Sequence, residues 1–229
     1  MSTSIVPQLV GKDLRLMRST ILMFVLVSLV FIAILDLLFG RVPVAVLANF
    51  GFILLAGPAG TCGIVMLMKT NVFEKEKSTL PFIMSLPVTV KEFTQAKLLF
   101  NLPVFSLFWL AISSAGFYFA FGRGLLPPGA VPFVTMVFLG GFVAYTCILA
   151  TSLLSQSMPI TVLSIALFEV GTSGYLWTVV FLAPIAQNIG GAQAVWNMPA
   201  IAIVAAQVLV AVSVILITLR ILSNKRDFI

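Results

Sequence analysis

The stretch FEKEKSTLPFIMSLPVTVKEFTQAKLL, residues 73–99, concentrates charge in an otherwise apolar chain. Its charged residues are Glu74, Lys75, Glu76, Lys77, Lys91, Glu92 and Lys97. Of the 229 residues in the chain 61% are hydrophobic and 9% are charged, whereas soluble domains carry about 25% charged residues. A globule of this size has too little interior for so much apolar surface, so we expect an integral membrane protein.

On both sides of this stretch the chain contains runs long enough to cross a bilayer, which takes about 20 apolar residues in a helix. The six runs are residues 21–39, 44–68, 98–121, 131–154, 160–183 and 198–219, and none contains lysine or arginine. We therefore expect an all-α fold with six transmembrane helices, in which residues 1–229 form a single transmembrane domain.

The basic residues predict the orientation of these helices in the membrane. Arg41 and Arg123 lie on one side of the predicted bundle. The other side carries Lys12, Arg15, Arg18, Lys69, Lys75, Lys77, Lys91, Lys97, Arg220, Lys225 and Arg226. Because loops rich in lysine and arginine stay in the cytoplasm, both termini and residues 73–99 are predicted to be cytoplasmic.

The residues before the first run have an amphipathic helical pattern. Val6, Leu9, Val10, Leu14 and Met17 share one face, and the opposite face carries Gln8, Lys12, Arg15 and Ser19. This pattern favours a separate interfacial helix over residues 1–19, lying on the inner surface of the membrane. The alternative is a simple extension of the first transmembrane helix into the cytosol.

Within residues 73–99 the pattern predicts a helix, a stop and a second helix. Ser78 or Thr79 can cap a short helix over residues 80–86, and Pro87 ends it. Thr89 and Glu92 have the spacing of a capping box that starts the next helix. The short helix presents an apolar tip, which suits docking better than a solvated loop; alternatively, the tip folds back onto the membrane. The residues of the tip are Leu80, Phe82, Ile83 and Met84.

A few polar side chains fall inside the apolar runs. Glu169 lies about ten residues into the fifth run, roughly 15 Å from its inner end and so near the membrane midplane. A charge there costs about 2.5–3.5 kcal/mol on insertion scales, so Glu169 is a candidate for a transport path or for a packing hydrogen bond. Trp109, Tyr145 and Asn101 are further candidates for a polar path, and Asp36 can pair with Arg41.

The second run contains LLAGPAGTCG, in which small residues recur every four positions. The pairs Ala56 with Gly60 and Ala59 with Gly63 predict close approach of neighbouring helices. The cysteines, Cys62 and Cys147, lie inside apolar runs, where we expect small buried side chains rather than a disulfide.

At residues 73–99 the chain resembles an ABC-2 type transporter permease. The resemblance rests on the pattern E-K-E-K-S-T-L…S-L-P-V-T…E-F…A-K, together with the amphipathic N-terminus, six runs and an apolar excursion between the fifth and sixth runs. The short loops are most similar to the small bacterial subgroup that includes exporters of phenol-soluble modulins and other membrane-active peptides. The resemblance implies an ABC-2 (type V exporter-like) fold in the bacterial cytoplasmic (inner) membrane.

The resemblance also implies partners and a mechanism. Such permeases pair with a second permease copy, identical or a sister chain, and with a P-loop ABC ATPase that supplies ATP and Mg²⁺. This sequence has no G-x-x-x-x-G-K-[ST] motif, so we expect no ATP site or other cofactor on this chain and no enzymatic activity of its own. Residues 80–86 would be the coupling helix in the ATPase groove. The residues implied in ATPase coupling are Glu74, Glu76, Leu80, Phe82, Ile83, Met84 and Ser157.

The leading hypothesis is therefore an exporter subunit that moves hydrophobic or amphipathic substrates, first peptides or toxins, then lipids or drugs. The alternative is an ATPase-independent secondary carrier or channel that uses Glu169 as its ion site. An assembly or immunity protein is a further class. The absence of histidine argues against an intramembrane enzyme with a Ser-His-Asp triad or a histidine zinc site. The net charge of +6 lies at the membrane edges, which argues against a nucleic-acid partner.

Overall fold

The computed structural model describes residues 5–76 and 88–224, and the regular structure in these ranges is helical. The long helices are α1 (Ile5–Leu38), α2 (Val44–Leu67), α5 (Val90–Phe117), α6 (Val131–Ser155), α7 (Met158–Phe181) and α9 (Met198–Asn224). Short elements connect them: η1 (Met68–Val72), α3 (Phe73–Glu76), η2 (Tyr118–Gly122), η3 (Pro128–Ala130) and α8 (Ala183–Ile189). Six helices are long and apolar enough to cross a membrane, which confirms the prediction of a multi-pass membrane protein.

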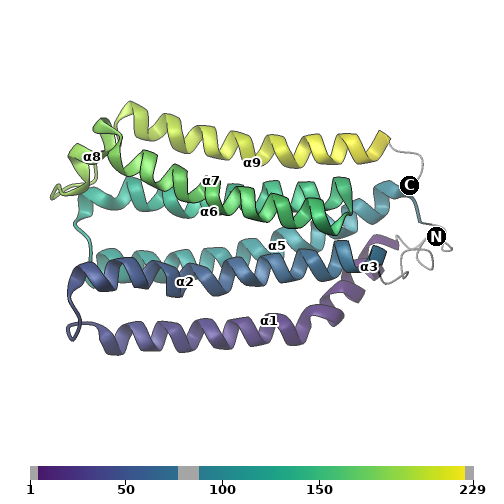
Figure 1. Ribbon diagram of the computed structural model, residues 1–229, viewed down its shortest axis with the longest axis horizontal. Helices are drawn as coiled ribbons and strands as arrows, with labels where there is room; N and C mark the ends of the chain where they lie inside the picture. Colours follow the sequence, from purple (N-terminus) through teal and green to yellow (C-terminus); the bar gives the residue numbers. More distant parts are fainter. Residues whose placement is uncertain (1–4, 77–87, 225–229) are drawn as a thin grey trace.

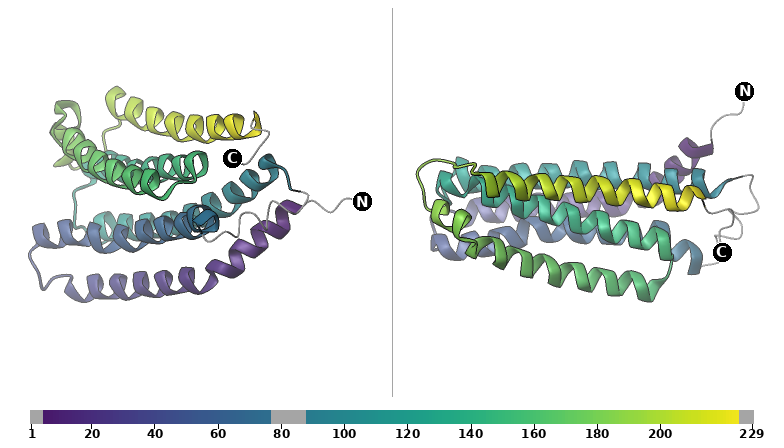
Figure 2. Two further views of the ribbon diagram at one scale, coloured as in Figure 1. Left: turned by 45° about the vertical axis from the view of Figure 1, so that its right-hand side comes forward. Right: turned by 90° about the horizontal axis from the view of Figure 1, so that it is seen from above.

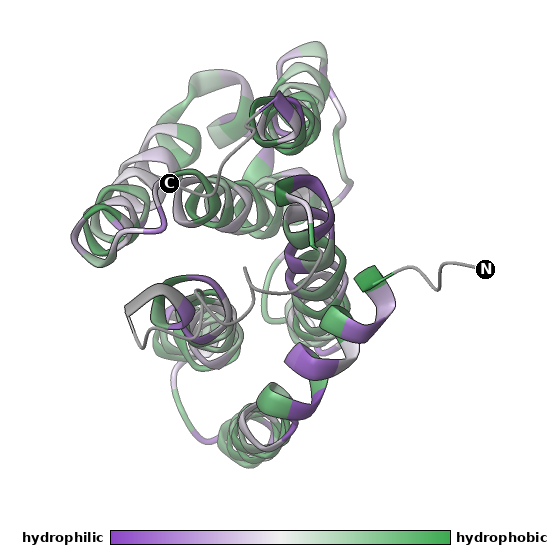
Figure 3. Ribbon diagram, turned by 90° about the vertical axis from the view of Figure 1, so that its right-hand side faces the viewer, coloured by the Kyte–Doolittle hydropathy of each residue, from purple (hydrophilic) through white to green (hydrophobic). Residues whose placement is uncertain are grey.

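The long helices run side by side as a bundle (Figure 1). Viewed along the bundle they form two groups, one of α1, α2 and α5 and one of α6, α7 and α9 (Figure 3). The two groups meet where α5 packs on α9 and α6 and where α2 packs on α6. Helix α1 begins and α9 ends at the same end of the bundle, which we call the basic end because it carries Lys12, Lys69 and Arg220 (Figure 1).

Burial differs between the central and the peripheral helices. Half of the most apolar window of η3–α6 is buried, whereas only 11% of the corresponding windows of α1 and α7 is buried. The outer faces carry exposed Leu26, Val170 and Leu209. Such an apolar exterior is stable where lipid rather than water surrounds it, which agrees with the composition.

Local sequence determines where several helices begin and end. Pro43 precedes α2 with an extended backbone, as suits a residue outside the first turn. Helix α6 ends at Gln156, whose φ of 46° is left-handed and so breaks the helical path. Met158 then starts α7 after a connection of only two residues, so α6 and α7 pack as neighbours.

The predicted break between an interfacial helix over residues 1–19 and the first span is wrong, because α1 is continuous from Ile5 to Leu38. The helix bends in its N-terminal part instead (Figure 2). Part of the predicted apolar face packs on protein: Leu9 lies in a cluster with Val88, Phe93 and Ala96 of the segment that starts α5. The start of α5 therefore buries part of the apolar face that the sequence pattern placed on the membrane surface.

The opposite end of the bundle corrects one predicted ion pair and contains a short helix. Asp36 pairs with Arg123, at 2.9 Å between Oδ1 and Nη2, rather than with Arg41. In the apolar excursion between the fifth and sixth runs, α8 is followed by irregular chain. Asn188 and Asn197 each donate a side-chain hydrogen bond to the carbonyl of Pro184, which ties the irregular chain to α8.

Candidate functional site

A cavity of about 400 Å³ lies between α2 and α7, on the boundary between the two helix groups. Helices α5 and α6 form its inner wall. Ile53 of α2 and Glu169 of α7 line it and are exposed, so the cavity opens to the side of the bundle. Helix α2 belongs to one helix group and α7 to the other, so this opening lies between the two groups.

The inner wall of the cavity is aromatic. Phe105 stacks on Tyr145, with 3.5 Å between ring centroids, and on Trp109, with 5.5 Å between centroids. The indole N–H of Trp109 donates to the carbonyl of Phe138 at 2.8 Å, and the hydroxyl of Tyr145 donates to the carbonyl of Asn101 at 3.4 Å. Because backbone carbonyls take these donors, the three rings, which are all buried, give this wall an apolar rather than a polar character.

Two glycines allow this wall to form. A Cβ on Gly63 would lie 2.6 Å from Phe105 and 2.8 Å from Tyr145, and one on Gly141 would lie 2.6 Å from Trp109. Only a residue without a side chain fits at these distances. Of the predicted small pairs, Ala59 and Gly63 therefore pack in the interior, whereas Ala56 and Gly60 line the cavity.

Most polar side chains that line the cavity are on α7. Glu169 lines it together with the hydroxyl residues Thr172 and Ser173, and Thr61 lines it from α2. Among the described residues that line the cavity, Glu169 is the one acid, and there is no lysine or arginine. The structure thus brings together three of the four residues predicted for a transport path, Glu169, Trp109 and Tyr145.

The fourth residue, Asn101, is fully buried next to the cavity wall in a different cluster. Its Nδ2 donates to Thr70 Oγ1 at 3.1 Å and to the carbonyl of Lys97 at 3.0 Å. Asn71 completes the cluster by donating to Ser152 Oγ at 2.9 Å. This amide cluster joins α5, η1 and α6; the π-helical turn of η1 directs the consecutive residues Thr70 and Asn71 inward.

At the basic end, four charged side chains form a largely buried ion cluster. Asp13, Glu74 and Lys97 are buried, and Lys12, whose side chain is 41% exposed, completes the cluster at the surface. Lys97 Nζ lies 2.8 Å from both Asp13 Oδ2 and Glu74 Oε2. Lys12 pairs with Glu74 and, at 3.2 Å, with Asp13 Oδ1. The side chain of Lys97 is 1% exposed and that of Asp13 is not exposed. The cluster has no net charge, as the burial of ions requires, and it joins α1, α3 and α5.

Of the residues predicted for ATPase coupling, some lie in the described part of the chain and others lie outside it. Glu74 is buried at 7% exposure and paired within the chain, so its carboxylate faces inward. Glu76 ends α3, and Leu80, Phe82, Ile83 and Met84 lie outside the described residues. Ser157 is half-buried as the residue before α7, at the basic end, and its carbonyl accepts a hydrogen bond from Thr161.

The predicted capping box at the start of α5 is confirmed. The Thr89 side chain accepts from the amide of Glu92 at 3.2 Å, and the Glu92 carboxylate accepts from the amide of Thr89 at 2.9 Å. Each side chain satisfies an amide that the helix leaves without a partner. Helix α5 therefore begins, shortly after residue 87, with a capped first turn.

We expect Thr89→Ala to weaken this start by about 1 kcal/mol, since a capping side chain contributes that much. Amide hydrogen exchange at Glu92 and Phe93 should then be about fivefold faster, as that free energy implies. The matched control is Thr178→Ala, because Thr178 is exposed and bonds only to a carbonyl of its own helix among the described contacts. Unchanged exchange at Glu92 would contradict a capping role for Thr89.

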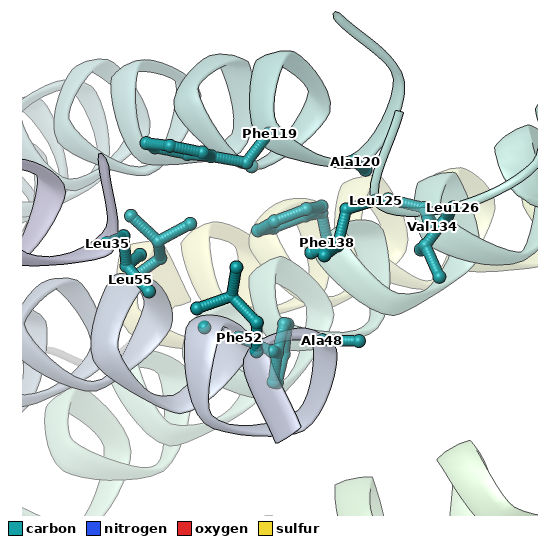
Figure 4. A pocket seen from close by; sticks show the side chains of 13 residues that line it. Leu35, Ala48, Phe52, Leu55, Phe119, Ala120, Leu125, Leu126, Val134 and Phe138 are labelled. Atoms are coloured by element: carbon teal, nitrogen blue, oxygen red, sulfur yellow. The ribbon is translucent and has the colours of Figure 1, made fainter. Parts of the chain in front are cut away.

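A second cavity, of about 80 Å³, lies near the end of the bundle opposite the basic end, between α1, α2, η2 and α6 (Figure 4). Leu55, Phe119 and Phe138 point into it, and its described lining is apolar throughout. With no polar group in that lining, it offers a ligand no hydrogen bond or charge, and we regard it as a packing defect.

Asp13, Thr70 and Asn71 were not singled out by sequence reasoning, and Lys97 was counted only for orientation. Their signal was spacing: Lys97, Asn101, Phe105 and Trp109 recur every four residues along one face of α5, and Asp13 lies midway between the buried Leu9 and Met17. One face of α5 thus runs from the ion cluster, through the amide cluster, to the cavity wall.

No group of three or more His, Cys, Asp or Glu side chains among the described residues is arranged to hold a metal ion. Comparisons with known proteins add no relative, because no family model, no curated protein and no solved structure matches the chain.

Proposed function

We propose that this chain is the transmembrane subunit of an ATP-driven exporter for hydrophobic or amphipathic substrates, with ABC-2 type architecture. The observation that carries the proposal is how residues 77–87 are attached. The chain leaves α3 beside Glu74, which is held in the ion cluster, and it enters α5 at the Thr89–Glu92 capping box. Force on this segment would pass to α3 at one end and to α5 at the other.

The attachment suggests how such a force would reach the membrane. The ion cluster links α3 to α1 and α5, and α3 continues from α2 through η1. Force on residues 77–87 would therefore act on the group of α1, α2 and α5 together. Because the cavity lies between this group and α7, movement of the group would widen or narrow it.

The partner in this proposal is a separate P-loop ATPase that binds ATP and Mg²⁺. Glu76 and the coupling helix over residues 80–86 would contact it, and Ser157 would provide a second contact at the α6–α7 connection. Burial of Phe82, Ile83 and Met84 would contribute about 1.5–3 kcal/mol each if complete. Glu74 would act from within the chain by anchoring α3.

The complex would contain two permease copies, identical or sister chains, in the bacterial inner membrane with both termini in the cytoplasm. Eleven basic residues at the predicted cytoplasmic side support this orientation. The substrates we favour are peptides or toxins, then lipids or drugs, because the cavity is walled by rings and opens toward lipid.

A second candidate function is an ATPase-independent carrier or channel with Glu169 as its ion site. It is favoured by one observation, the exposure of this carboxylate to a cavity within the bundle. It gives no role to the apolar residues Phe82, Ile83 and Met84.

Co-purification separates the two candidates. We expect the tagged chain, extracted in several mild detergents, to retain a P-loop ATPase in stoichiometric amount. Replacing Phe82 and Met84 together by aspartate should reduce the recovered ATPase to background, because two charges would enter an apolar contact. Lys91→Asp is the matched control, since it adds negative charge close by, at an exposed position in the first turn of α5. Recovery of the wild-type chain without an ATPase would favour the carrier, and retention by the double variant would contradict the docking tip.

A further inference from the structure

We infer that the cavity between α2 and α7 binds an amphipathic cation, with the positive head group at Glu169 and the apolar body against the aromatic wall. The inference rests on the proposed function and names the class of molecule that it would move. It concerns binding, so it can be tested without the ATPase.

The charge of the head group follows from the described lining of the cavity. Glu169 faces it, and none of the basic residues described elsewhere in the bundle lines it. A carboxylate inside a lipid-embedded bundle is costly without a counter-ion, and a cationic ligand supplies one. The carboxylate would repel an anionic ligand, and a neutral ligand would supply no counter-ion for it. Thr172 and Ser173 add hydroxyls beside Glu169 that can orient the head group.

The apolar body follows from the opposite wall. Phe105, Trp109 and Tyr145 are stacked, and the donors of Trp109 and Tyr145 are taken by carbonyls. The wall therefore offers apolar area, which attracts hydrocarbon. Polar groups on one side and rings on the other match a molecule with a charged end and an apolar end.

Size and access are consistent with such a ligand. A cavity of about 400 Å³ falls in the range that holds drug-sized molecules. Exposed Ile53 and Glu169 stand at its rim, so a molecule that partitions into the membrane reaches it sideways between α2 and α7. Gly60 of α2 leaves open space, since a Cβ there would meet nothing within 4 Å.

The test compares two probes of matched shape and opposite charge, tetraphenylphosphonium and tetraphenylborate. Binding of each to the purified full-length chain in uncharged detergent is measured by equilibrium dialysis, with protein-free micelles as the blank. We expect the phosphonium to bind about tenfold more tightly than the borate, as a charge-assisted contact implies. Equal binding of the two ions, or tighter binding of the borate, would overturn the inference.

Two pairs of variants assign the preference to this cavity. Glu169→Gln should abolish the preference for the cation, whereas Asp36→Asn, which removes an acid paired with Arg123 at the far end, should preserve it. Gly60→Leu should weaken binding of both ions by filling the cavity, whereas Gly174→Leu should not, because Gly174 also faces open space but does not line the cavity. A cation preference that survives Glu169→Gln would place the site elsewhere and overturn the inference.

The purified wild-type and Glu169→Gln proteins also test whether a second copy of the chain, rather than a cation, covers the opening of the cavity. If Glu169→Gln changes the oligomeric mass by light scattering and wild-type protein shows no cation preference, the carboxylate belongs to an interface and the inference fails. The proposed function and the cation site can fail separately. If the chain co-purifies with no ATPase but binds the phosphonium more tightly, the exporter function is contradicted and the cation site is supported. If it co-purifies with an ATPase but binds both ions equally, the exporter function is supported and the cation site is contradicted.

Discussion

Lys97→Met is expected to lower the free energy of unfolding by about 3–5 kcal/mol, the cost of removing one partner of a buried ion pair. The substitution keeps the length of the side chain and removes the ammonium that lies 2.8 Å from both Asp13 and Glu74. Two buried carboxylates would then share Lys12 alone, and the cluster would carry a net negative charge. The measurement is unfolding of the purified chain in mixed micelles with increasing SDS.

Lys91→Met is the matched control, because Lys91 lies on the same helix and is exposed. It should leave the free energy of unfolding within about 0.5 kcal/mol of the wild-type value, as exposed substitutions do. Equal effects of the two methionine variants would show that the cluster contributes nothing to stability.

Restoring the charge balance should recover part of the loss. Adding Asp13→Asn to Lys97→Met leaves Lys12 and Glu74 as a balanced pair, so the double variant should be more stable than Lys97→Met alone. Such non-additivity is the signature of residues that interact directly. A double variant whose loss equals the sum of the single losses would argue against the ion pair.

Gly63→Ala and Gly57→Ala are expected to change stability in opposite directions although both place a methyl on α2. At Gly63 the new Cβ would lie 2.6 Å from a Phe105 ring that is itself stacked on Tyr145, so the wall must shift. Overpacking of this kind costs about 1–3 kcal/mol. At Gly57 nothing lies within 4 Å of a Cβ, and alanine should stabilise the helix by up to about 1 kcal/mol.

The SDS unfolding assay checks this pair directly. Gly63→Ala should also redshift or broaden the tryptophan emission of the chain, to which Trp109 contributes with Trp177 and Trp196, if the wall relaxes toward the cavity. Gly57→Ala should leave this emission unchanged. A stabilising Gly63→Ala would mean that the rings move aside without cost and that the close approach is not required for the wall.

Features that depend on neighbouring residues could be predicted from the sequence. The length of each apolar run determines a membrane-crossing helix because only a helix satisfies its own backbone hydrogen bonds in lipid. Each of the six runs falls on one of the six candidate spans, although α1 begins at Ile5, well before its run. The capping box was predictable for the same reason: Thr89 and Glu92 satisfy amides within three residues of themselves. The cavity residues Glu169, Trp109 and Tyr145 were found because polar and aromatic groups stand out in an apolar run.

Features that depend on distant residues were decided by the tertiary structure alone. Asp13 meets Lys97 across 84 residues, and Asp36 pairs with Arg123 instead of the nearer Arg41, because packing of the helices sets which charges meet. The sequence also does not show which side of each helix faces protein, because lipid and the protein interior select the same apolar residues. Composition therefore specifies that this chain crosses a membrane, and only packing specifies that a largely buried ion cluster and an aromatic cavity lie along one face of α5.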